Sequence, residues 1–205
     1  GVPYYVVGGT GFFRQQEVFD VLNALRAIDN PYDDVAFVGA LRSALFGLDD
    51  EALLRLSEAV RPPYLPALRT AAEIGRDAAQ VVHGLPAPAA RALDFAVELL
   101  GRLARQKDAL GPDGLIDALM AETGYEGALR AQFQGRQKLG NVRRLAELAR
   151  TAAADGTSPA DLLTAMNERT IDESREEQAA VAGEAEDVVR LMTIHKAKGL
   201  EFPVV

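Results

Sequence analysis

Two short β-like segments enclose a long stretch of helical periodicity, and this order limits the folds that the chain of 205 residues can adopt. Residues 2–7, "VPYYVV", are β-branched and aromatic and run into the turn "GGTG". Residues 188–194, "VVRLMTI", again read as a buried strand. We expect a mainly α fold whose two β-like ends meet in one sheet, with the remaining strands of that sheet outside this sequence.

The middle of the chain is predicted to be helical throughout. In residues 15–28 the apolar side chains recur at steps of three and four, the pattern of one face of an amphipathic helix. Ser158, Pro159 and Asp161 together form a typical helix start. The predicted helices are 15–28, 34–46, 50–59, 66–82, 87–106, 114–121, 125–150 (broken near Gly135 or Gly140) and 159–170.

Composition excludes several classes of protein. The chain has no Cys, so disulfides, thiol nucleophiles and Cys-based metal sites are ruled out. No apolar run reaches the ~20 residues that a membrane-spanning helix needs, and the first residues do not resemble a secretory signal. We therefore expect a cytoplasmic protein with no membrane partner.

Charge is unevenly distributed. The net charge is −8, but residues 172–187 hold seven acids and one Arg, a net −6, which leaves −2 for the rest of the chain. This acidic segment has no strong apolar periodicity and is predicted to be a mobile linker. Between Arg130 and Arg150 six basic residues stand against the single acid Glu147. That basic stretch either faces phosphate or is an ordinary solvated helix face.

The last residues, "RLMTIHKAKGLEFPVV", concentrate polar chemistry at the end of a strand. Thr193 and His195 alternate with apolar residues and so share one face of the extended segment. Lys198 and Gly199 offer a cation and an unobstructed backbone N–H to an anion, and Glu201 can accept hydrogen bonds from a ribose. These residue types suit a polyphosphate that meets a nucleic-acid backbone, although each alone is common in loops and helix caps.

As a whole, "LMTIHKAKGLEFPVV" closely resembles motif V of the UvrD/Rep-type superfamily 1 DNA helicases. The segment "YYVVGGTGFFRQQEVFDVLNALRAIDNPYDDVAF" resembles another motif of the same family, and its continuation is most similar to the branch with AddA and RecB-like helicase-nuclease subunits. A weaker similarity covers residues 122–148, which look like a late stretch of the family's helical 2B subdomain.

The resemblance implies a division of the chain, because in this family the 2B subdomain interrupts the RecA-like α/β motor domain 2A. The expected parts are an incomplete 2A strand and turn at 1–14, a helical 2B-type subdomain at 15–171, the acidic linker at 172–187, and a second piece of 2A with motif V at 188–205. We thus expect a fragment of a larger polypeptide.

The resemblance also implies site residues and ligands. Thr193 and His195 are expected to contact DNA, and Lys198, Gly199 and Glu201 to contact the nucleotide, with Lys198 able to couple the two ligands. The intact enzyme is expected to use ATP and Mg²⁺. Its expected partners are single-stranded DNA, junctions of single- and double-stranded DNA, and a helicase-nuclease partner subunit.

The implied function is that of a 3′-to-5′ ATP-dependent DNA helicase in DNA repair and recombination, in which the 2B region guides or regulates unwinding. This sequence contains no G-x-x-x-x-G-K-[ST] phosphate loop, and no Asp-Glu pair stands at the end of an upstream apolar strand, so we expect no catalytic residues, no metal site and no ATP hydrolysis by the chain alone. The alternative is a non-catalytic helical module that docks a partner protein. A small enzyme is disfavoured, because no nucleophile, metal cluster or carboxylate pair is evident.

Four smaller features also lead to expectations. Phe12 and Phe13 either stack on bases or, the interpretation that we favour, anchor the junction between strand and helix in the core. Glu17 is read as an acid at a helix N-terminus, and His83 is assigned no role. Related helicases often carry a basic Gly-x-Gly segment that grips duplex DNA, whereas residues 49–51 of this chain are acidic. The acidic residues put duplex binding by the loop at 49–51 in doubt, and they suggest instead that this loop caps the helix that follows.

Overall fold

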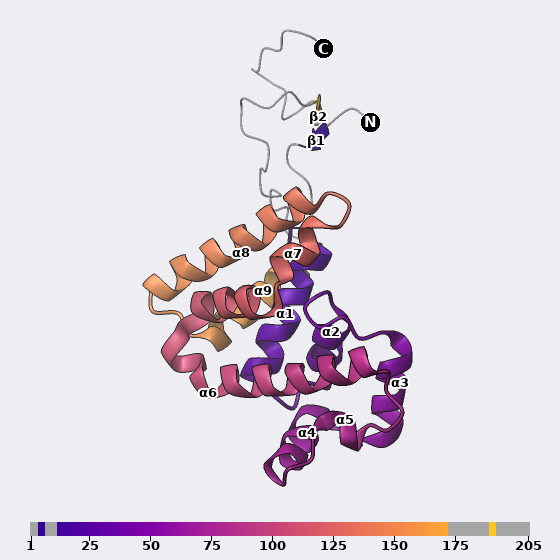
Figure 1. Ribbon diagram of the computed structural model, residues 1–205. Helices are drawn as coiled ribbons and strands as arrows, with labels where there is room; N and C mark the ends of the chain where they lie inside the picture. The colour runs from indigo at the N-terminus through magenta and orange to yellow at the C-terminus, as the bar shows by residue number, and fades with distance from the viewer. Residues whose placement is uncertain (1–3, 7–11, 172–188, 192–205) are drawn as a thin grey trace.

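The computed structural model describes residues 4–6, 12–171 and 189–191, and it confirms the mainly α fold (Figure 1). Helices form one body, and a short strand from each end of the chain lies beyond it. The elements are β1 (Tyr4–Val6), η1 (Phe12–Arg14), α1 (Gln16–Asp29), α2 (Asp34–Arg42), α3 (Asp50–Ala59), α4 (Tyr64–Glu73), α5 (Ala78–Val81), α6 (Ala87–Thr123), α7 (Tyr125–Arg130), α8 (Gly135–Ala154), α9 (Pro159–Ile171) and β2 (Val189–Leu191).

The two strands pair with each other. β1 and β2 run parallel, with Tyr4 opposite Val189 and Val6 opposite Leu191. The chain therefore leaves one strand, forms the whole helical body, and returns to a strand beside the first. The carboxyl ends of both strands lie at the same edge of the pair, which is the edge where open α/β sheets place their ligand-binding loops.

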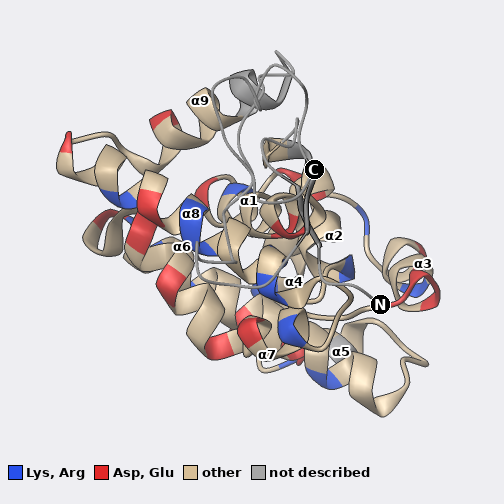
Figure 2. Ribbon diagram, turned by 90° about the horizontal axis from the view of Figure 1, so that it is seen from above, with Lys and Arg blue, Asp and Glu red and all other residues tan. Residues whose placement is uncertain are grey.

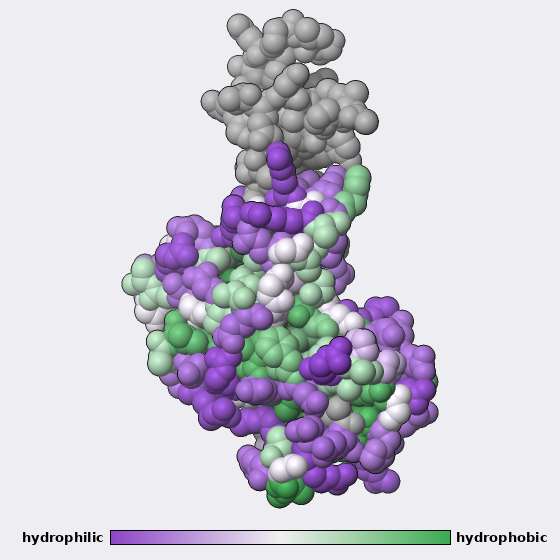
Figure 3. All heavy atoms as spheres, in the orientation of Figure 1, coloured by the Kyte–Doolittle hydropathy of each residue, from purple (hydrophilic) through white to green (hydrophobic). Residues whose placement is uncertain are grey.

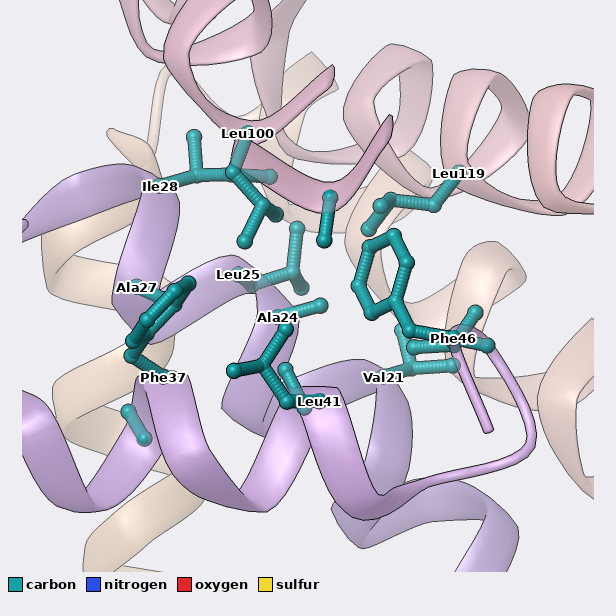
Figure 4. Packing of buried hydrophobic residues seen from close by; sticks show 14 of the residues in the cluster. Val21, Ala24, Leu25, Ala27, Ile28, Phe37, Leu41, Phe46, Leu100 and Leu119 are labelled. Atoms are coloured by element: carbon teal, nitrogen blue, oxygen red, sulfur yellow. The ribbon is translucent and has the colours of Figure 1, made fainter. Parts of the chain in front are cut away.

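Helix α1 is the centre of the body. It contacts η1, α2, α6, α8 and α9, so almost every side of it is covered. Figure 4 shows Val21, Leu25 and Ile28 of α1 among side chains from the neighbouring helices, including Phe37 and Leu100. One continuous cluster of buried apolar residues runs from Phe12 to Met166. The apolar periodicity of residues 15–28 thus predicted the central helix of the core.

Side-chain caps fix where several helices begin. The carboxylate of Asp33 accepts a hydrogen bond from the backbone N–H of Ala36 at 2.9 Å, at the start of α2. Asp49 does the same with Ala52 at 2.8 Å, at the start of α3. At the start of α9 the Ser158 hydroxyl accepts from the N–H of Asp161 at 3.2 Å. Each cap satisfies a backbone donor that the helix itself leaves unpaired.

Glycines explain where the predicted helix boundaries were wrong. Residues 66–82 do not form one helix, because α4 stops at Glu73 before Gly75, whose φ is +78°. The predicted helices 87–106 and 114–121 are joined in α6, which bends where Gly111 has φ 68° and ψ 175° and is followed by Pro112. The break predicted near Gly135 or Gly140 lies at Gly135, the first residue of α8. None of the helices in the described ranges combines the length and apolar character needed to cross a bilayer.

Candidate functional site

The junction between the strand pair and the helical body is built on two phenylalanines. Phe12 and Phe13 are 0% and 2% exposed, and their rings meet edge to face with centroids 5.0 Å apart. The guanidinium carbon of Arg144, from α8, lies 5.3 Å from the centroid of the Phe12 ring, a cation–π contact. Neither ring is available to a base. The prediction that these residues anchor the junction in the core is confirmed.

Behind this junction, Glu17 is part of the core. Its side chain is only 3% exposed, although the sequence suggested an ordinary acid at a helix N-terminus. The side-chain amide of Asn141, on α8, donates a hydrogen bond of 2.6 Å to the Glu17 carboxyl group. A buried carboxyl group is costly without such a donor, so this bond ties the start of α1 to the middle of α8.

A second buried carboxylate lies one turn further along α1. The Tyr125 hydroxyl, at the start of α7, donates to Asp20 at 2.7 Å, and the side-chain amide of Gln16 donates to the other oxygen at 2.7 Å. Burial raises the pKa of Asp20 above its ordinary value, and the charge of Glu17 adds to this, while the two hydrogen bonds and Lys138 oppose it. Burial and the neighbouring Asp20 also raise the pKa of Tyr125, so its hydroxyl stays protonated and keeps donating.

These four side chains form a structural cluster. We call Glu17, Asp20, Tyr125 and Asn141 the junction cluster, since their hydrogen bonds hold α1 against α7 and α8. Both carboxyl groups are buried and accept hydrogen bonds from neutral donors of the protein. Within the described part of the chain, no group of His, Cys, Asp and Glu side chains is arranged to hold a metal ion.

The basic stretch is partly neutralised in the fold. Arg130 forms an ion pair of 2.5 Å with Glu126, and Arg143 reaches the same carboxylate at 3.4 Å. Arg150 pairs with Glu147 and lies 3.9 Å from Asp113. Figure 2 shows acidic segments among the basic ones on the helices around α8. These three arginines fit the interpretation as a solvated helix face, whereas Arg136 and Lys138 have no ion pair with any described residue.

The acidic run at the start of α3 caps that helix. Asp49 is the capping residue, and Asp50 forms a salt bridge of 2.8 Å with Arg42, the nearest cation. The helix-cap interpretation of these residues is confirmed. The cation beside the loop is therefore engaged by a carboxylate.

The residues predicted to bind DNA and nucleotide follow β2 directly. Strand β2 ends at Leu191, and Thr193, His195, Lys198, Gly199 and Glu201 all lie outside the described residues, as does the acidic linker 172–187. Their roles stay predictions.

Sequence reasoning missed the junction cluster, although the three-residue step from Glu17 to Asp20 places both on the face of α1 that also carries Ala24 and Ile28.

The sequence of this chain is similar to those of known proteins. Residues 96–205, more than half of the chain, match the family described as UvrD-like helicase C-terminal domain. The A subunit of an ATP-dependent helicase/nuclease from Bacillus cytotoxicus (strain DSM 22905 / CIP 110041 / 391-98 / NVH 391-98) is 33% identical over 214 residues, which cover 100% of this chain and 16% of that protein. Proteins with the same description from Bacillus mycoides (strain KBAB4) and Bacillus cereus (strain AH820) give the same identity and coverage. The chain thus spans 16% of the length of these relatives, and it belongs to the UvrD-like helicase C-terminal domain family.

Proposed function

We propose that this chain forms part of an ATP-dependent DNA helicase that acts in DNA repair and recombination. The observation that carries the proposal is the parallel pairing of β1 with β2. These two strands come before and after the helical body in the sequence, and motif V begins where β2 ends. An α/β motor sheet interrupted by a helical subdomain has this connectivity. Family membership supports the same function.

In this proposal the helical body, residues 15–171, is a 2B-type subdomain that guides or regulates unwinding, and β1 and β2 are two strands of motor domain 2A. The intact helicase moves 3′ to 5′ and uses ATP and Mg²⁺. The likeness to the helicase/nuclease proteins from Bacillus suggests a helicase-nuclease partner subunit. The chain alone is inactive, because its sequence holds no phosphate loop.

The proposed ligand contacts are those of motif V. Thr193 and His195 contact the single-stranded DNA backbone, while Gly199 and Glu201 contact the phosphate and ribose of the nucleotide. Lys198 lies between the two groups in sequence and couples them. The edge of a parallel sheet at which β1 and β2 end is the usual place for such loops, which supports this assignment.

His195 provides the sharpest test. In the intact polypeptide that contains this chain, His195→Ala should lower the ATP turnover stimulated by limiting single-stranded DNA by about tenfold, the equivalent of one hydrogen bond to a charged group. His83→Ala is the matched control, since His83 is exposed on the turn after α5. Unchanged DNA-stimulated turnover in His195→Ala would contradict the assignment.

One observation favours the alternative, a helical module that docks a partner protein. Three arginines of the basic stretch already have carboxylate partners, which reduces the charge that they offer to DNA. The two functions differ in their salt dependence. Binding through phosphate contacts weakens steeply as salt rises, whereas protein docking need not.

A further inference from the structure

The turn between α7 and α8 has a fixed shape. We call residues 131–134 the α7–α8 tip. Its backbone is closed by hydrogen bonds from the N–H of Gln132 to the carbonyl of Leu129 at 3.0 Å and from the N–H of Gly135 to the carbonyl of Gln132 at 3.1 Å. A Cβ at Gly135 would lie 2.4 Å from the carbonyl oxygen of Leu129, so only glycine fits there. The backbone of the tip thus forms a defined, hydrogen-bonded turn.

That side chain is Phe133, which is 80% exposed. The other large apolar side chains that are exposed among the described residues belong to different segments, namely Tyr32, Val35, Leu54, Ile74, Phe95 and Leu110. Its neighbours in the tip are the amides Gln132 and Gln134, not further apolar groups. Phe133 is therefore the only exposed large apolar side chain of its own segment within the described residues. Protein-docking surfaces, by contrast, are usually contiguous apolar areas with a polar rim.

The sequence on both sides of Phe133 is basic. No Asp or Glu occurs between Gly127 and Ala146. Arg136 is exposed and has neither an ion pair nor a hydrogen bond to any described side chain, and Lys138 donates only to the neutral amide of Gln132, at 2.6 Å. The first turn of α8 carries no acid, so the positive end of the helix dipole adds to these charges.

An exposed aromatic ring beside cations that have no ion pair with a described residue matches a single-stranded nucleic acid, whose bases stack on rings while its phosphates attract cations. The tip also lies at the end of the helical body from which β1 and β2 extend (Figure 1). On the face drawn in Figure 3, that end of the body carries hydrophilic residues together with apolar ones. We propose that the α7–α8 tip contacts single-stranded DNA, with Phe133 stacking on a base and Arg136 binding a neighbouring phosphate. This inference rests on the proposed helicase function and adds a contact outside motif V.

The test uses the intact polypeptide that contains this chain and a fluorescein-labelled oligo(dT), with affinity measured by anisotropy over a range of salt concentrations. Phe133→Ala should weaken binding about 5- to 100-fold, which is what the loss of one stacked base produces. Arg136→Ala should weaken binding and reduce the slope of log affinity against log salt by about 0.7, the value for one phosphate of a single strand.

The matched controls are Ile74→Ala and Arg76→Ala at the end of α4, because Ile74 is a 72% exposed apolar side chain with an exposed cation beside it. Neither control should change the affinity. Oligo(dT) binding that is tight and unaffected by Phe133→Ala would overturn the inference and leave the proposed function standing. If Phe133→Ala abolishes binding of a protein partner but leaves the DNA affinity unchanged, the inference is also overturned, and the tip is a protein-docking site instead. If the unsubstituted polypeptide does not bind oligo(dT), the proposed function and the inference both fail.

Discussion

Glu17 and Asp20 lie three residues apart on α1 and are both buried, but they accept hydrogen bonds from different donors. Glu17 binds an amide of α8, and Asp20 binds a phenol of α7 and an amide of its own helix. Burial dominates the balance at Asp20 and raises its pKa. The folded state therefore holds a proton on Asp20 at pH values where the unfolded chain has already released it, so ionisation of Asp20 opposes folding.

This leads to a prediction for the pH dependence of stability. As pH falls from 7 through the raised pKa of Asp20 toward its unfolded value, near 3.8, the wild-type chain should gain stability relative to Asp20→Asn, because only the wild type takes up this proton. The measurement is the difference in urea unfolding free energy between the two proteins at each pH. Asp117→Asn, at an exposed position on α6, is the control for the loss of one carboxyl group. A wild type that loses stability relative to Asp20→Asn on acidification would contradict this sign.

The hydrogen bonds of the junction cluster could not be predicted from the sequence. The donors that reach Glu17 and Asp20 from other helices are Asn141 and Tyr125, more than a hundred residues away in the chain. No local pattern reveals which distant side chain will supply a hydrogen bond, so Glu17 looked like a solvated helix acid. Phe12 and Phe13 were predicted correctly, because two adjacent aromatic rings at a strand-to-helix junction favour burial whatever their partners are.

Helix starts were more predictable than helix ends. Asp49 and Ser158 cap from within their own turn, so their effect can be read from a few neighbouring residues. Helix ends depend on glycines whose backbone angles are set by packing. Gly75 ended α4 where a single helix was predicted, and Gly111 bent α6 where a gap between two helices was predicted.

The bend in α6 depends on glycine. With φ 68° and ψ 175°, Gly111 occupies a backbone region that is essentially restricted to glycine, so Gly111→Ala should destabilise the chain by about 1 to 3 kcal/mol. Chemical denaturation followed by circular dichroism measures this change. Gly127→Ala in α7 is the matched control, since its Cβ would meet nothing within 4 Å and its φ is not positive. That control should be neutral or stabilising by up to about 1 kcal/mol. Equal stability of the two variants would argue against a strained bend.

At the scale of the whole molecule, the sequence predicted that the two ends meet, and the strands do pair. The five predicted site residues that follow β2 stay predictions, because they lie outside the described residues. The reason that the pairing was predictable is physical. A strand cannot satisfy the hydrogen bonds of its own backbone, so a second β-like segment of the same chain is a natural partner.

The helical body should fold without the strands. Its buried apolar cluster extends continuously from Phe12 to Met166, and a two-stranded pair of this length adds little stability of its own. A polypeptide of residues 12–171 should therefore unfold in urea in one cooperative transition, with the same midpoint as the 205-residue chain. Fluorescence and circular dichroism should give coincident curves. A broad transition, or a clearly lower midpoint, would mean that the strand pair supports the core.

The parallel pairing has a consequence for how such proteins can change over evolution. Parallel neighbours always need a crossover connection, and the entire helical body occupies that place between β1 and β2. Closing a flexible connection of twice the length costs only about 0.6 kcal/mol more. The body can therefore lengthen, shorten or be exchanged for an unrelated insert without altering the order of the strands, so the insert and the sheet are free to evolve at different rates.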